Sequence, residues 1–109
     1  MSARRGLLPG TVDVLILQTL QAEPMHGYGI SRLVRERSGG LLTIESAALY
    51  QALHRLERKK WVRSEWGVSE TNRRARFYQL TAKGREHLSR EREELRSYMA
   101  ALDLVLDPT

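Results

Sequence analysis

Hydrophobic residues recur every three or four positions along four stretches of the chain, a spacing that predicts four helices. The first helix is expected to follow Thr11, a residue type that caps helix N-termini, and to stop near residues 23–24. It is apolar on nearly every side, and such helices are usually buried on more than one side. In a chain of 109 residues, this suggests burial against a second copy as well as against the chain's own core.

The second helical stripe follows the turn-rich segment at residues 26–29 and is expected to end at Gly39, which can adopt the left-handed C-cap conformation. The third helix is predicted to have its N-cap at Ser46, with Tyr50 and Arg55 on its flanks. Its core-facing stripe comprises Leu49, Ala52, Leu53 and Leu56. Its opposite face carries Ala47, Gln51, His54 and Arg58. Three helices with a basic free face on the third are the minimum for a helix-turn-helix.

Two short runs rich in β-forming residues predict the strands of a hairpin, at residues 62–66 and 75–80. The polar loop at residues 67–72 gives this hairpin a longer connection than a tight two-residue turn. Alternation places Tyr78 and Leu80 on one strand face, which we expect to point at the core. Alternation alone leaves the directions of Trp66 and Phe77 open.

A last helix of roughly 25 residues is expected after Thr81, its predicted cap. Its apolar positions form a sparse heptad stripe of Leu88, Leu95, Met99, Leu102 and Leu106. An ordinary core helix would also show such a stripe. The length and terminal position of this helix favour pairing with a partner helix.

Positive charge is concentrated on the third helix and the hairpin. The chain has 18 Lys and Arg against 13 Asp and Glu, a net charge of +5. Eight of the basic residues and only three of the acidic residues lie between His54 and Arg76, so this segment holds the whole excess. A positive field on two consecutive elements points to a polyanionic partner, although a solvated basic face is the alternative.

The sequence offers no constellation for enzymatic chemistry. It has no cysteine, which excludes disulfides and thiolate sites and fits a reducing cytoplasm. Its three histidines lack metal-ligand spacing, and no phosphate-binding glycine loop occurs, so we predict no metal, no cofactor and no enzyme activity. Arg4-Arg5 before an apolar stretch could pass for an export signal, but Asp13 and Gln18 interrupt that stretch. No run approaches the roughly 20 residues that span a bilayer, so the expected location is the cytoplasm.

Several motifs, in this order and spacing, resemble the PadR family of winged-helix transcriptional regulators. They are MHGYGI, LYQALHRLE, W-V-x-S-E-W-G and RRARFYQLT-x-x-G. The resemblance covers nearly the whole chain, from Leu8 into the last helix, and is closest to the branch with a single C-terminal helix. It implies a homodimer formed by the first and last helices, a third helix in the major groove and a wing near the adjacent backbone. It also implies repression of nearby genes and release from DNA when a small molecule binds.

Two positions depart from the family pattern. Gln51 stands where many members carry proline after the tyrosine, which changes the side chain that faces the base edges. The last helix has no tryptophan, whereas in some relatives an aromatic residue there sandwiches flat ligands. Tyr98 is the nearest aromatic substitute.

We therefore interpret the chain as mainly α with a small β-hairpin. A winged helix-turn-helix DNA-binding domain at residues 1–80 precedes a C-terminal dimerisation helix at residues 81–109, within one compact domain. The predicted function is sequence-specific binding of double-stranded DNA by a transcriptional regulator, a ligand-responsive repressor that acts as a homodimer on an inverted repeat. The alternative is a winged-helix interaction module that binds an acidic protein partner or RNA.

Three sets of residues follow from this interpretation. The predicted DNA contacts are Ser46, Ala47, Tyr50, Gln51, His54, Arg55, Arg58, Lys59, Lys60, Arg73, Arg74 and Arg76. The predicted dimer interface comprises Val12, Leu15, Leu88, Leu95, Met99, Leu102 and Leu106. A small-molecule effector is expected near Leu15, Leu95, Tyr98 and Met99. Two alternatives stay open, because Tyr50 suits core packing as well as a phosphate contact, and the hairpin arginines could pair with Glu65 across the strands.

Overall fold

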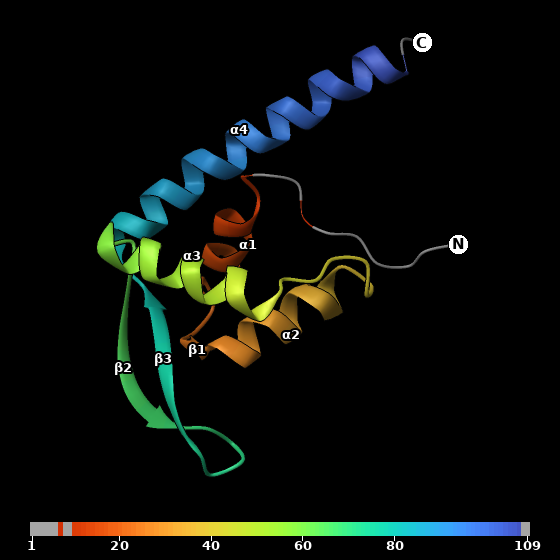
Figure 1. The fold of residues 1–109 in the computed structure, drawn as a ribbon. Helices are drawn as coiled ribbons and strands as arrows, with labels where there is room; N and C mark the ends of the chain where they lie inside the picture. Colours follow the sequence, from red (N-terminus) through yellow and green to blue (C-terminus); the bar gives the residue numbers. More distant parts are fainter. Residues whose placement is uncertain (1–6, 8–9, 108–109) are drawn as a thin grey trace.

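The structure, a computed structural model, describes Leu7 and residues 10–107. Arg4 and Arg5, considered above as an export signal, lie outside the described residues. The described part contains four helices and a three-stranded antiparallel sheet (Figure 1). The elements are α1 (Val12–Thr19), β1 (Met25–His26), α2 (Gly27–Arg37), α3 (Ser46–Arg58), β2 (Val62–Val68), β3 (Arg74–Leu80) and α4 (Ala82–Leu106). The prediction of a mainly helical chain with a small hairpin is confirmed.

The core lies where α1, α2, α3, the base of the hairpin and the start of α4 meet. Ile16 and Leu17 of α1 are fully buried there. The predicted apolar stripe of α3 is buried along its whole length. Tyr78 and Leu80 of β3 also point into the core, as alternation predicted. Since one continuous core supports both α3 and the hairpin, these two elements have a fixed relative orientation.

Strands β2 and β3 form a hairpin, residues 62–80, that we call the wing. Its register pairs Val62 with Leu80 and Trp66 with Arg76, so each strand extends further toward the tip than predicted. The two-residue strand β1 adds to the other edge of β3, giving the order β1-β3-β2. The sequence predicted only a turn at this place, because two residues are too few to show alternation.

One helix end follows the prediction, and two others depart from it. Helix α2 ends as predicted, since Gly39 is left-handed with φ 66° and the N–H groups of Gly39 and Gly40 bond to carbonyls of the last turn. The N-cap of α3 is Glu45, not Ser46, which is already the first helical residue. Helix α1 ends at Thr19 rather than near residues 23–24. The Thr19 hydroxyl donates a hydrogen bond to the Ile16 carbonyl of the preceding turn, and a single tighter turn follows, closed by the Gln21 N–H on the Gln18 carbonyl.

Hydrogen bonds and close packing join the start of α4 to the residues that follow α3. Thr81 caps α4 as predicted, because its Oγ1 accepts a hydrogen bond from the Gly84 N–H at 3.0 Å. Thr81 also bonds to the residues between α3 and β2, through its N–H to the Trp61 carbonyl at 3.1 Å and its Oγ1 to the Lys60 carbonyl at 2.7 Å. Gly84 packs so closely on the Trp61 carbonyl that a side chain at this position would collide with it.

Helix α4 is only partly covered by the rest of the chain. Its first half packs on α1, and its second half runs clear of the other helices (Figure 1). Leu88 is 1% exposed and belongs to the core, so its predicted place in the dimer interface is corrected. Leu95 is half-buried against the core, whereas Met99, Leu102 and Leu106 are exposed. An apolar stripe therefore continues along α4 beyond the point where this chain can cover it.

Candidate nucleic-acid interface

The free face of α3 carries much of the predicted set of DNA contacts. Because its apolar stripe packs into the core, the opposite face of α3 points outward. The predicted residues that lie exposed on this outward face are Ser46, Ala47, Gln51, His54 and Arg58. Amide, imidazole and guanidinium groups on one helix face are the groups that can bond base edges in the major groove. The structure thus presents this part of the set on an accessible helix surface.

Tyr50 lies beside this face and is 44% exposed. Its ring rests over the start of α2, where a Cβ added to Gly27 would lie only 2.7 Å from the phenol carbon Cζ. Glycine at position 27 is therefore what allows the ring to lie against the backbone of α2. Packing and exposure occur together, so the two interpretations of Tyr50 are compatible with each other.

The two lysines after α3 lie at a junction of elements. Lys60 adopts a left-handed backbone with φ 68°, which turns the chain from α3 into the wing. The Lys59 Nζ lies 4.7 Å from the centre of the Trp61 ring. That ring stacks on His87 of α4, with 3.6 Å between the ring centres. Lys59 is therefore held at the junction of α3, the wing and α4.

Two arginines of the predicted set have acidic partners within the chain. Arg55 forms an ion pair with Asp13 of α1, which ties α3 to α1. Arg76 donates through Nε to the Ser64 hydroxyl at 2.8 Å, and its Nη2 lies 3.7 Å from the Glu57 carboxylate. Ser64 in turn donates to Glu57 at 2.7 Å. These partners offset part of the positive charge of both arginines. The alternative left open by the sequence, a pairing of the hairpin arginines with Glu65, is not among the ion pairs within residues 10–107.

Trp66 faces the same side of the wing as the core residues of β3, a direction that the sequence left open. Its partner across the strands is Arg76, and alternation puts Arg74 and Tyr78 on that side too. The guanidinium carbons of Arg74 and Arg76 lie 4.7 and 5.6 Å from the centre of the Trp66 ring. Trp66 is nevertheless 55% exposed. Desolvation raises the pKa of the buried Tyr78 phenol, although the nearby Arg76 opposes this, so the phenol stays neutral at physiological pH. We call the side that carries Trp66 the inner face of the wing.

The tip of the wing contacts α2 through His26. The His26 Nδ1 accepts the N–H of Gly29 at 3.0 Å and so caps α2, while its Nε2 lies 3.3 Å from the Glu70 carboxylate. The His26 ring also meets the edge of Phe77, with 5.3 Å between ring centres. A backbone hydrogen bond and the His26 side chain lower the pKa of Glu70. Arg73 follows this tip and is exposed.

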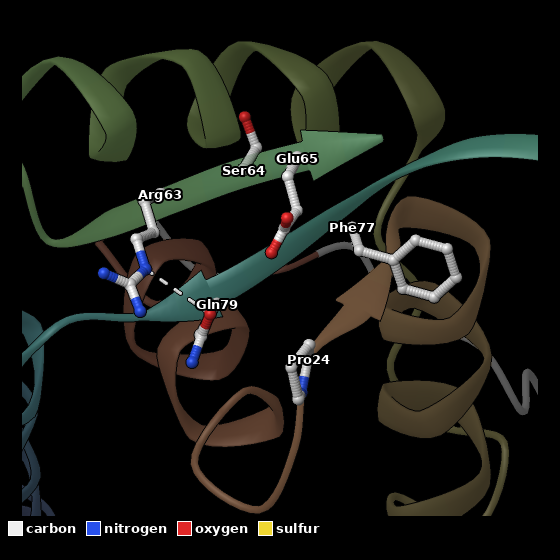
Figure 2. Close-up of a pocket in the computed structure, with 6 residues that line it drawn as sticks. All are labelled: Pro24, Arg63, Ser64, Glu65, Phe77 and Gln79. Carbon is white, nitrogen blue, oxygen red and sulfur yellow. Dashed lines mark hydrogen bonds between the residues drawn. The ribbon is translucent and has the colours of Figure 1, made fainter. Parts of the chain in front are cut away.

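The two sides of the wing differ in character. On the inner side, a broad groove of about 1110 Å³ separates the wing from α2 and the start of α3. Side chains that line it include Tyr28, Arg32, Tyr50, Trp66, Arg73, Arg74 and Arg76. On the outer side, a small hollow of about 240 Å³ is lined in part by Pro24 and Phe77. Arg63, which also lines this hollow, donates a hydrogen bond to Gln79 (Figure 2). The positive charge of the wing is therefore concentrated toward the groove.

The predicted effector residues are only partly enclosed by this chain. Leu15 and Leu95 pack against the core, while Tyr98 and Met99 are 63% and 48% exposed. Neither of the two hollows described above is lined by these residues. Among the described residues, no group of three or more His, Cys, Asp or Glu could hold a metal ion, and no helix is long and apolar enough to cross a membrane.

Helices packed under an outward-facing third helix, followed by a β-hairpin, define the winged helix-turn-helix class of DNA-binding proteins. Residues 16–90 match the PadR-like family of transcriptional regulators. The chain therefore belongs to this family, whose members are transcriptional regulators rather than enzymes.

Two solved structures of transcriptional regulators agree with this assignment, and an uncharacterised curated relative matches most of the chain. A transcriptional regulator from Clostridium thermocellum is 31% identical with a TM-score of 0.78, covering 86% of this chain and 88% of its own. A PadR family regulator from Clostridium difficile is 29% identical with a TM-score of 0.77, covering 89% and 99%. An uncharacterised protein from Lysinibacillus sphaericus is 26% identical over 104 residues, which is 95% of each chain.

Proposed function

We propose that this chain is a ligand-responsive repressor that binds an inverted repeat in double-stranded DNA as a homodimer. The observation that carries the proposal is the placement of exposed polar groups on α3 beside an arginine-bearing wing. Helix α3 would enter the major groove, and the wing would approach the phosphates beside it. Such a regulator acts where the chromosome lies, so we propose a cytoplasmic location.

Recognition of the operator is assigned to α3 and general affinity to the wing. Gln51 can bond adenine with both ends of its amide, and Arg58 can bond guanine in the same way. Arg73 and Arg74 are exposed, and no ion pair engages either of them within residues 10–107. Their charges are therefore available to phosphates, which carry no sequence information.

The dimer is proposed to form through α4, with residues 81–109 as the dimerisation segment. Met99, Leu102 and Leu106 are 48%, 40% and 77% exposed on a helix that this chain leaves uncovered. Burying such a stripe against the same stripe of a second copy removes it from water and gives the two-fold symmetry that an inverted repeat requires. Val12, Leu15 and Leu95 are half-buried and flank the same interface.

The effector is proposed to bind between α1 and α4, beside the proposed dimer interface. Leu15, Leu95, Tyr98 and Met99 lie on α1 and α4, and a second copy would close the space that one chain leaves open. A ligand bound there would favour one spacing of the two α3 helices over another, and so would change DNA affinity. Repression is the usual outcome that the family resemblance implies.

A gel-shift titration tests the proposal, with the duplex upstream of the chain's own gene, an unrelated duplex and a series of salt concentrations. We expect specific binding that weakens steeply with salt. Arg73→Ala and Arg74→Ala should weaken binding to every duplex and reduce the salt slope by about one unit each. Arg63→Ala is the matched control, because Arg63 is an exposed arginine on the outer side of the wing.

Substitutions on α3 should act differently from those on the wing. Gln51→Ala or Arg58→Ala should change the preferred sequence, at about 1–3 kcal/mol for the affected base pair. An unchanged preference in both variants would mean that α3 does not face the bases in the proposed way. Equal binding of wild-type protein to all duplexes would favour the alternative, an interaction module for an acidic protein or RNA.

A further inference from the structure

Trp66 of the wing is a large aromatic residue that is not buried in the core of this chain. A large apolar ring is normally buried in a core or an interface, yet Trp66 is 55% exposed in this chain. It lies on the inner face of the wing, beyond the core residues of β3. Its ring is instead the surface over which two guanidinium groups lie, those of Arg74 and Arg76. Two positively charged groups therefore pack on the ring of Trp66.

The two arginines depend on Trp66 to different degrees. Arg76 is also fixed by Ser64 at 2.8 Å and by the Glu57 carboxylate at 3.7 Å. Arg74, by contrast, forms no ion pair and no side-chain hydrogen bond within residues 10–107. Its guanidinium carbon lies 4.7 Å from the centre of the Trp66 ring. If Trp66 were removed, Arg76 would keep its other partners, whereas the Arg74 side chain would be unrestrained.

We propose that Trp66 is a positioning residue that holds the Arg74 guanidinium ready to bind a DNA phosphate. This inference rests on the proposed DNA-binding function of the wing. A guanidinium that lies over an aromatic ring keeps its N–H groups free at its edge, where they can donate to phosphate oxygens. A long side chain loses rotamer freedom when it binds, and a restraint already present in the free protein reduces that loss.

This role predicts a combination of effects that a direct contact would not give. Trp66→Leu removes the aromatic face but no charge, so the number of phosphates neutralised, and hence the salt slope, should stay the same. Affinity should fall about two- to fivefold on every duplex, the size expected for one exposed cation–π contact. Trp66→Phe keeps a ring at the position and should restore most of the affinity.

A double-mutant cycle tests the inference, with wild-type protein, Trp66→Leu, Arg74→Ala and the double variant titrated against the same specific and unrelated duplexes. We expect Trp66→Leu to weaken binding in the wild-type background and to have no further effect once Arg74 is alanine. Circular dichroism melting of each variant verifies that the fold is kept, which the exposure of Trp66 leads us to expect.

Two results would overturn the inference while leaving the proposed function intact. One is an equal loss from Trp66→Leu in both backgrounds, which would mean that Trp66 acts on DNA or on the fold without Arg74. The other is a wild-type-like affinity of Trp66→Leu. Failure of the wild-type protein to bind any duplex would instead overturn the proposed function, and this inference with it.

Discussion

Gly84 lies in the first turn of α4, where this helix packs on Trp61, a residue that follows α3. Replacement of Gly84 by alanine tests that packing. A Cβ at this position would lie 2.9 Å from the carbonyl carbon of Trp61 and 2.9 Å from Cδ1 of Leu80, and closer still to the Trp61 oxygen. Ordinary carbon contacts are about 3.5–4.0 Å, so the helix start must shift by roughly 1 Å. The main obstacle is backbone, which a side-chain rotation cannot relieve.

The expected loss of stability follows from two opposing effects. Overpacking of this kind costs about 1–3 kcal/mol, while alanine returns at most about 1 kcal/mol through its better helix propensity. The free energy of unfolding should therefore fall by about 1–2 kcal/mol for Gly84→Ala. In a domain of this size that corresponds to a decrease in Tm of roughly 4–8 °C.

Gly29→Ala is the matched control, because the two glycines occupy the same position in their helices. Each is the third helical residue, and each donates its N–H to the N-cap side chain at 3.0 Å, to Thr81 for Gly84 and to His26 for Gly29. At Gly29, however, an added Cβ would meet its nearest neighbour at 3.4 Å, an ordinary contact. Urea unfolding at fixed chain concentration measures both variants. Equal stability of Gly84→Ala and Gly29→Ala would refute the packing argument.

Three further predictions concern the ion pairs and α4. Arg55→Ala should lower the free energy of unfolding by about 0.5–1 kcal/mol, and a urea double-mutant cycle with Asp13→Ala should show coupling; zero coupling would contradict the pair. Leu102→Asp should give a folded single chain by light scattering, because Leu102 is 40% exposed, and a retained two-copy mass would exclude pairing through this stripe. The pKa of the Glu70 carboxyl should lie below 4.5 when measured by NMR. The stability that the ionised carboxylate contributes is therefore present above pH 4.5 and is lost as the pH falls through the lowered pKa. An ordinary pKa would contradict its contacts.

Structural features that depend on neighbouring residues in the sequence could be predicted. Features that depend on contacts between residues far apart in the sequence could not. The apolar stripe of α3 was predicted correctly because helical periodicity reflects burial directly, and Tyr78 and Leu80 followed from strand alternation. The direction of Trp66 depends on the register of β2 against β3, which alternation within one strand does not contain. Once that register is known, the position of Trp66 opposite Arg76 follows from it.

The candidate site shows the same division. The exposed face of α3 follows from its stripe, so Gln51 and Arg58 were placed correctly on the surface of the helix. The partners of Arg55 and Arg76 come from α1 and from the end of α3, and no local pattern links these residues. Leu88 fits the heptad as well as its neighbours do, but the fold buries it in the core of its own chain, where it is 1% exposed.

The hydrogen bonds of Thr81 to Lys60 and Trp61 have a mechanical consequence for regulation. They join the start of α4 directly to the residues that follow α3, so a movement of α4 is passed on to the end of α3. In the proposed two-copy assembly, a ligand that altered the angle between the two α4 helices would therefore move both α3 helices at the same time. An effector bound near Leu95 and Tyr98, as proposed above, would then act on α3 through α4 itself, without any further element between them.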